Sequence, residues 1–177
     1  ANDATQTTAA NQPKIYDSST GVVTENGKPI LRRTASTQGL VTSLTGNATA
    51  FSFSVMYAAD KSVFLREASS QSEYLLAANS GSSSGTNSNF SVDNYYVNGS
   101  EITPSNQIDV FNAISSSQKL VALNFDSSNV GTGYEFGFGG TAGYGIYEMQ
   151  EVIIYHSDQS ANRTNIEDNI NTFYSIY

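Results

Sequence analysis

Tyrosine, asparagine and aspartate side chains gather at one point of the sequence in the combination that carbohydrate sites use. Asp93, Asn94, Tyr95 and Tyr96 stand directly before an Asn-Gly dipeptide. A sugar ring presents an apolar C–H face and an edge of hydroxyls, so its sites combine an aromatic ring with amide and carboxylate groups. A second, aromatic group follows on later loops: Tyr134, Phe136, Tyr144 and Tyr147. We predict a glycan-binding surface from these two groups, although a protein rich in Tyr and Phe also needs such rings in its core.

Oxygen-bearing side chains in the same regions also suit a cation. Calcium takes roughly six to eight oxygen ligands from carboxylates, amides and carbonyls. The side chains that could converge on such an ion are Asp93, Asn94, Asp126 and Asn129. No contiguous calcium-loop motif is present, so calcium is the one cofactor that the sequence leaves open.

Motifs for catalysis are missing. Glu148 and Glu151 are three residues apart on a predicted strand, so we expect them on opposite faces, where they cannot flank one substrate. The single histidine, His156, has no nucleophile at a recognisable spacing. The glycines between 137 and 145 lack the Lys-Ser/Thr ending of a phosphate loop. We therefore predict no catalytic residues and no enzyme.

The composition indicates one loop-rich β domain with an acidic surface. The chain has 177 residues, a net charge of −8, 11 Tyr, 9 Phe and no cysteine, which excludes disulfides and zinc–thiolate sites. An acidic surface repels phosphate backbones, so we expect no nucleic-acid partner and interpret Arg32-Arg33 as a solvated strand end. No apolar run approaches the roughly 20 residues needed to cross a bilayer, so we expect no membrane insertion.

Alternating hydrophobicity predicts about ten short strands. The clearest is 50–58, where Phe51, Phe53, Val55 and Tyr57 alternate with smaller side chains. Asn-Gly dipeptides at positions 26–27 and 98–99 predict hairpin turns. Residues 79–89 form a low-complexity stretch that we expect to be a mobile loop, and 106–117 is ambiguous with helix-like spacing.

Both ends of the chain differ from the strand pattern. Residues 1–13 are polar without an apolar period and predict an extended arm. At the other end, Ile166, Ile170 and Phe173 recur at helical spacing and predict a terminal helix over 157–174, capped by Ser157 or Asp158. We expect its apolar stripe to lie against the sheets.

The closing strand resembles that of laminin-G-like domains of the concanavalin A-like superfamily. In "GIYEMQEVIIYHSDQSANRTNIEDNI", Glu151, Val152, Ile154 and Tyr155 stand at the family's positions, and "YYVNGSEIT" is similar to its Val-Asn-Gly hairpin. The opening residues are similar to a stretch in such proteins of marine bacteria and their phages. The resemblance implies an antiparallel jelly-roll β-sandwich that serves for recognition of glycans or cell-surface proteins, frequently with bound calcium.

Three functions follow, in descending order. The first is a recognition or adhesion module on a virion or bacterial cell surface, or otherwise extracellular, that binds a glycan or glycoprotein. The second is a structural subunit of a phage fibre, decoration or appendage, in which 1–13 or the terminal helix contacts neighbouring copies. The third is a glycoside hydrolase on the same fold, which the missing carboxylate pair disfavours.

Overall fold

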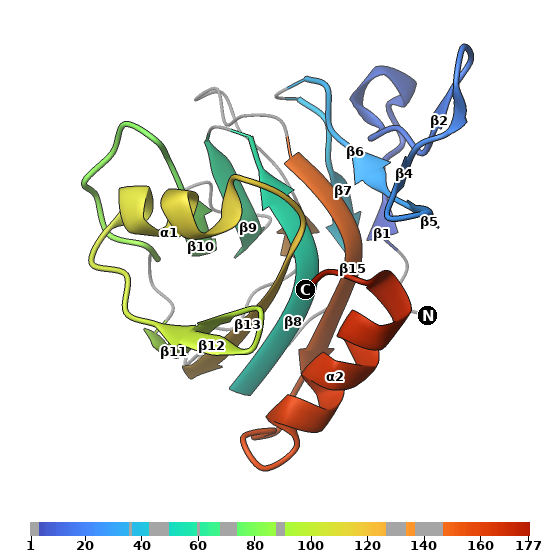
Figure 1. The fold of residues 1–177 in the computed structure, drawn as a ribbon. Helices are drawn as coiled ribbons and strands as arrows, with labels where there is room; N and C mark the ends of the chain where they lie inside the picture. Colours follow the sequence, from blue (N-terminus) through green and yellow to red (C-terminus); the bar gives the residue numbers. More distant parts are fainter. Residues whose placement is uncertain are drawn as a thin grey trace.

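The computed structural model describes residues 4–35, 37–42, 50–59, 61–67, 74–87, 91–126, 134–136 and 147–177. Its larger sheet has six antiparallel strands in the order β12-β11-β13-β8-β15-β6 (Figure 1). In that order they are Ser100–Ile102, Ser91–Val97, Lys119–Asp126, Ala50–Ala58, Tyr147–Tyr155 and Leu31–Arg32. The smaller sheet has five antiparallel strands in the order β1-β7-β14-β9-β10. These are Ala4–Thr5, Leu40–Thr42, Tyr134–Phe136, Ser62–Glu67 and Tyr74–Ala78.

Two small hairpins and three helical segments complete the described structure. The hairpins pair β2 (Tyr16–Asp17) with β3 (Gly21–Val22) and β4 (Thr24–Glu25) with β5 (Lys28–Pro29). The helices are a 3₁₀ turn (Ala9–Asn11), α1 (Gln107–Ile114) and α2 (Arg163–Tyr174). The prediction of a mostly β, antiparallel protein with a C-terminal helix is confirmed, and α1 resolves the ambiguous segment as a second helix.

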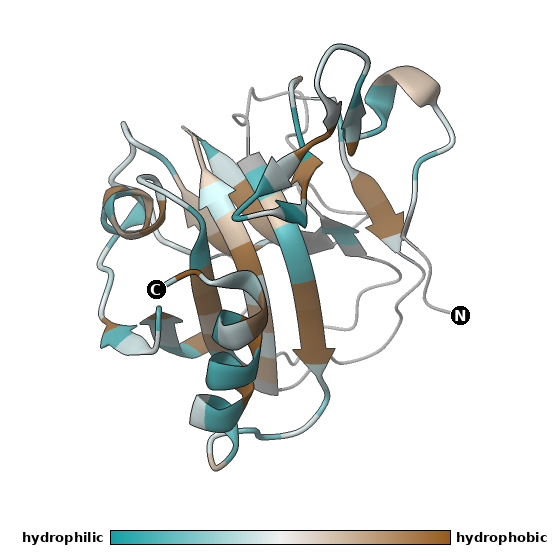
Figure 2. Ribbon diagram, turned by 45° about the vertical axis from the view of Figure 1, so that its right-hand side comes forward, coloured by the Kyte–Doolittle hydropathy of each residue, from teal (hydrophilic) through white to brown (hydrophobic). Residues whose placement is uncertain are grey.

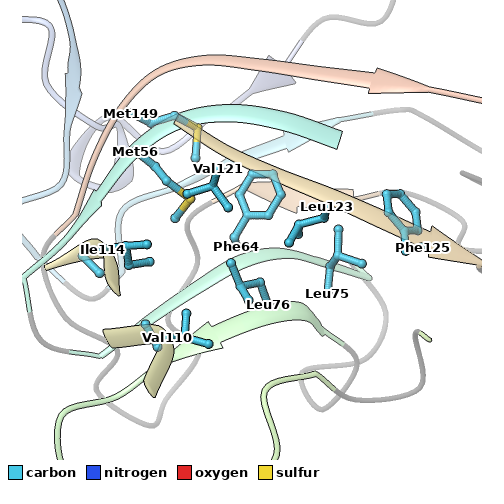
Figure 3. Close-up of a cluster of buried hydrophobic side chains, with 12 residues drawn as sticks. Met56, Phe64, Leu75, Leu76, Val110, Ile114, Val121, Leu123, Phe125 and Met149 are labelled. Carbon is cyan, nitrogen blue, oxygen red and sulfur yellow. The ribbon is translucent and has the colours of Figure 1, made fainter. Parts of the chain in front are cut away.

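The main core lies between the two sheets and includes one face of α1 (Figure 3). α1 begins there because Asn106 caps it, accepting hydrogen bonds from the backbone N–H of Ile108 and Asp109. The core residues are Met56, Ala58, Phe64, Leu75, Leu76, Ala78, Val110, Ile114, Val121, Leu123, Phe125 and Met149. Both sheets supply them, so the sheets pack face to face.

A second apolar cluster covers the outer face of the larger sheet under α2, where Figure 2 shows hydrophobic strand residues behind the helix. Its fully buried members are Phe51, Phe53, Val55, Leu120, Ala122 and Ile170. The alternation predicted in β8 is therefore confirmed, and its large residues face α2. Ser52 and Ser54 point to the other side and are also buried. β8 is covered on both faces.

The terminal helix differs from the prediction in its start and in its stripe. It begins at Arg163 rather than at 157, because Asp158 accepts hydrogen bonds from the N–H and hydroxyl of Ser160 and closes a separate turn. Ile170 packs on the sheet as expected. Phe173 is 56% exposed, and Tyr174 takes its place in the cluster.

The segments before β8 are bound into the fold more tightly than their composition indicates. In the described part of the predicted arm 1–13, β1 pairs with β7, and the carbonyl of Asn11 accepts from the N–H of Gly39. Arg33 is only 1% exposed, so the expectation of a solvated Arg32-Arg33 strand end is wrong. Arg32 instead pairs with Glu148 on the neighbouring strand, at 2.6 Å.

Candidate functional site

The predicted cluster before the second Asn-Gly turn is divided between the two faces of β11. Tyr95 points inward, packs against the main core and places its hydroxyl 2.8 Å from Thr86 Oγ1. Burial raises the pKa of the Tyr95 hydroxyl. Tyr96 points outward, where the Arg163 guanidinium lies 4.0 Å from its ring centroid. Adjacent strand residues face opposite ways, so the two rings cannot contact one ligand.

Asn94 lies on the outer face with Tyr96, and its amide is already engaged. Its Nδ2 donates to Glu101 Oε1 at 2.9 Å, and its Oδ1 accepts from Asn124 Nδ2 at 3.4 Å. Asp93 is exposed at a β-bulge, where the β11–β13 register shifts. The outer face thus brings together two of the four predicted residues, Asn94 and Tyr96.

The other predicted site residues lie at strand ends or outside the described residues. Asp126 ends β13, Tyr134 begins β14 and Tyr147 begins β15. Tyr144 and Asn129 lie outside the described residues, so the predicted calcium site has no geometry to assess. In the part of the chain that the structure describes, no three His, Cys, Asp or Glu side chains gather as metal ligands. No helix in that part is long and apolar enough to cross a bilayer.

A groove of about 660 Å³ lies on the outer face, between α2, β15 and the β4–β5 hairpin. We call it the helix groove. Its volume falls within the range of about 300–1,000 Å³ that is usual for small-molecule sites. The lining residues are Lys28, Glu151, Ile153, Asn169, Ile170, Thr172, Phe173 and Tyr174. They combine an apolar floor with amide, hydroxyl and charged groups.

The Lys28 ammonium and the Phe173 ring meet in this groove. Lys28 Nζ lies 3.9 Å from the centroid of the ring, within the range of a cation–π contact. Asn26 and Gly27, at φ 48° and 72°, form the tight turn that brings the Lys28 strand back toward α2. The ring of Tyr174 stands edge-on to Phe173, with centroids 4.9 Å apart.

Three hydrogen bonds hold the β4–β5 hairpin beside the groove. Gln150 Nε2 donates to the carbonyls of Glu25 and Lys28, at 3.0 and 3.3 Å. Asn26 Nδ2 donates to the carbonyl of Ser175, just after α2, at 3.0 Å. The backbone of Lys28 is therefore fixed from both β15 and the end of α2.

Glu151 supplies the carboxylate of the groove and is hydrogen-bonded to Tyr174. Burial chiefly raises the pKa of the Tyr174 hydroxyl, and the negative charge of Glu151 raises it further. The phenol therefore stays protonated and donates to the carboxylate at neutral pH. The remaining lone pairs of Glu151 are available to ligand hydroxyls.

Glu148 and Glu151 point to the same face of the larger sheet, contrary to expectation. Glu148 stands opposite Tyr57 and Glu151 opposite Val55, two residues on one face of β8. A β-bulge causes this, because the register shifts between Met149 and Glu151. The Glu148 carboxylate is held by Arg32, so among the described lining residues Glu151 is the only carboxylate.

Comparison with known proteins adds no relative. No protein-family model, curated protein or solved structure matches this chain. The function therefore has to be argued from the site itself.

The residues of the helix groove were not among the predicted site residues. Phe173 stands in the helical stripe and suggests a packed core residue from its spacing alone. The adjacent Tyr174 was the available signal, since only one of two neighbouring aromatic residues can face the sheet. Nothing local marks Lys28, because its contact with α2 joins distant parts of the chain.

Proposed function

We propose that this chain is a non-catalytic recognition module that binds a glycan in the helix groove. The observation that carries the proposal is the 56% exposure of Phe173 at the edge of a groove that also holds Asn169, Thr172 and Glu151. An exposed ring suits the C–H face of a sugar, and amide, hydroxyl and carboxylate groups suit its hydroxyls. Asn94 and Tyr96 lie on the same outer face of the sheet.

The proposal extends to the fold family and the setting of the protein. The antiparallel sheets, packed face to face, support a concanavalin A-like jelly roll, and the closing strand resembles that of laminin-G-like domains. With that resemblance goes a place on a virion, on a bacterial cell surface or otherwise outside the cell, and a glycan or glycoprotein as partner. No nucleic acid is proposed, because the net charge is −8.

A glycan array tests this function. We expect saturable binding of the wild type and its loss in Phe173→Ala. The matched control is Tyr16→Ala, which removes a ring that is 61% exposed and outside the groove. A wild type that is silent across diverse glycans, with and without added calcium, would overturn the proposal. Equal binding by Phe173→Ala would remove the site from the helix groove.

A structural subunit is the second candidate, and the β2–β3 hairpin favours it. Ile15, Tyr16 and Val22 are large, apolar and all more than half exposed in this hairpin. Exposed apolar groups that gather in one place mark contact surfaces. Sedimentation analysis distinguishes the candidates: a stable oligomer that Tyr16→Asp dissolves supports assembly, and a monomer at high concentration contradicts it.

A further inference from the structure

The positive charge of the helix groove identifies the class of sugar, given the proposed function. Lys28 forms no ion pair with any carboxylate of the described residues. Its ammonium rests on the Phe173 ring at 3.9 Å, and a ring holds a cation without neutralising its charge. In a protein of net charge −8, the groove therefore presents an ammonium that is available to an anion.

The position of this ammonium is prepared before any ligand arrives. Gln150 and Asn26 hold the hairpin to β15 and to the residue after α2. The aromatic ring restricts the end of the side chain. A charged group that is held in place in this way loses less entropy on binding than a free surface lysine.

The charges of the groove differ between its two sides. Lys28 comes from the hairpin, whereas Glu151 comes from β15 and already accepts from the Tyr174 hydroxyl. The two charges do not form an ion pair with each other. A ligand that satisfies both must carry an anionic group on one side and hydroxyl donors on the other.

We infer that the helix groove binds an acidic sugar, a uronic acid or another saccharide that bears a carboxylate. Its carboxylate pairs with Lys28, its C–H face lies on the exposed part of Phe173, and its hydroxyls donate to Glu151. A neutral sugar leaves the ammonium without a partner. A simple inorganic anion leaves the ring and the acceptor unused.

The test compares uronic-acid oligosaccharides with the same oligosaccharides after methyl esterification, which removes the charge and keeps the ring. Short oligogalacturonates and oligomannuronates serve as probes in calorimetric and NMR titrations, at low and at high salt. We expect the wild type to bind the acid form about fivefold more tightly than the ester, with the difference shrinking at high salt.

Charge variants assign the effect to Lys28. Lys28→Gln should lose that fivefold preference and still bind the ester, whereas Lys119→Gln, which removes the same charge outside the groove, should keep it. Equal wild-type affinity for acid and ester would overturn the acidic-sugar inference and leave glycan binding intact. A Lys28→Gln variant that retains the preference would also overturn it. Absence of binding to these probes and to every neutral glycan would overturn both proposals.

Discussion

The guanidinium of Arg163 lies flat enough over Tyr96 to place its central carbon 4.0 Å from the ring centroid. The same side chain donates to the carbonyl of Gly99 at 3.3 Å and to the Glu167 carboxylate. One residue at the start of α2 therefore joins the helix to the β11–β12 hairpin. The outer face that carries the helix groove depends on this attachment, because α2 forms one wall of the groove.

Replacing Arg163 should destabilise the protein strongly. The Glu167 side chain is 3% exposed, so Arg163→Ala leaves a buried carboxylate without its cation, at a cost of about 3 kcal/mol. Urea denaturation at neutral pH measures the loss. Adding Glu167→Gln to this variant should recover part of the stability, since the buried charge disappears. A double variant as unstable as Arg163→Ala would contradict the role assigned to the carboxylate.

The stability contributed by Glu167 should fall as the pH rises. Burial raises the pKa of this carboxyl above its ordinary value of 4.5, and Asp168 adds to the shift, while Arg163 opposes it. The folded protein therefore binds the proton more tightly than the unfolded chain. Stability from this group is fully present below pH 4.5 and is lost through the raised folded pKa. Denaturation from mildly acidic to neutral pH should show Glu167→Gln gaining on the wild type, and a difference independent of pH would contradict this.

Packing of α2 on the larger sheet should be visible in a pair of phenylalanine variants. Phe53 is fully buried beneath the helix, so Phe53→Ala should cost about 3–5 kcal/mol in the free energy of unfolding. Phe173 is mostly exposed, and Phe173→Ala should change stability by less than about 0.5 kcal/mol. Similar costs for the two variants, measured by chemical denaturation, would contradict the orientation of the helix.

The second Asn-Gly turn should require glycine for its backbone conformation. Gly99 has φ +77°, and a Cβ there meets only ordinary contacts, so Gly99→Ala should cost about 1–2 kcal/mol through strain alone. Gly99→Asn should cost less, because asparagine tolerates this conformation better. Gly81→Ala, at a glycine without positive φ, is the control and should be near neutral. Thermal and urea denaturation rank the three, and equal losses would contradict the strain.

Features encoded in short stretches of sequence were predictable, and contacts between distant segments were not. Alternation in 50–58 and both Asn-Gly turns depend on neighbouring residues, and the structure contains all three. The division between Tyr95 and Tyr96 also follows from period two. That periodicity argues against placing the two rings in one site.

The errors arise where the chain departs from a regular period or where a partner is distant. The bulge near Gln150 places Glu148 and Glu151 on one face, and an added residue in a strand leaves no mark in hydrophobicity. Burial of Arg33 likewise depends on neighbours that its own sequence context does not reveal. The Lys28 contact with α2 has the same origin.

Attachment of the β4–β5 hairpin to β15 and α2 sets the order in which the groove can form during synthesis. Lys28 leaves the ribosome early, whereas Gln150, Phe173 and Ser175 leave it much later. Contacts between such distant segments form only after the intervening chain has been made, and they are slow to close. A nascent chain that lacks α2 therefore has its hairpin but no binding site, and ligand affinity becomes a test of whether synthesis and folding are finished.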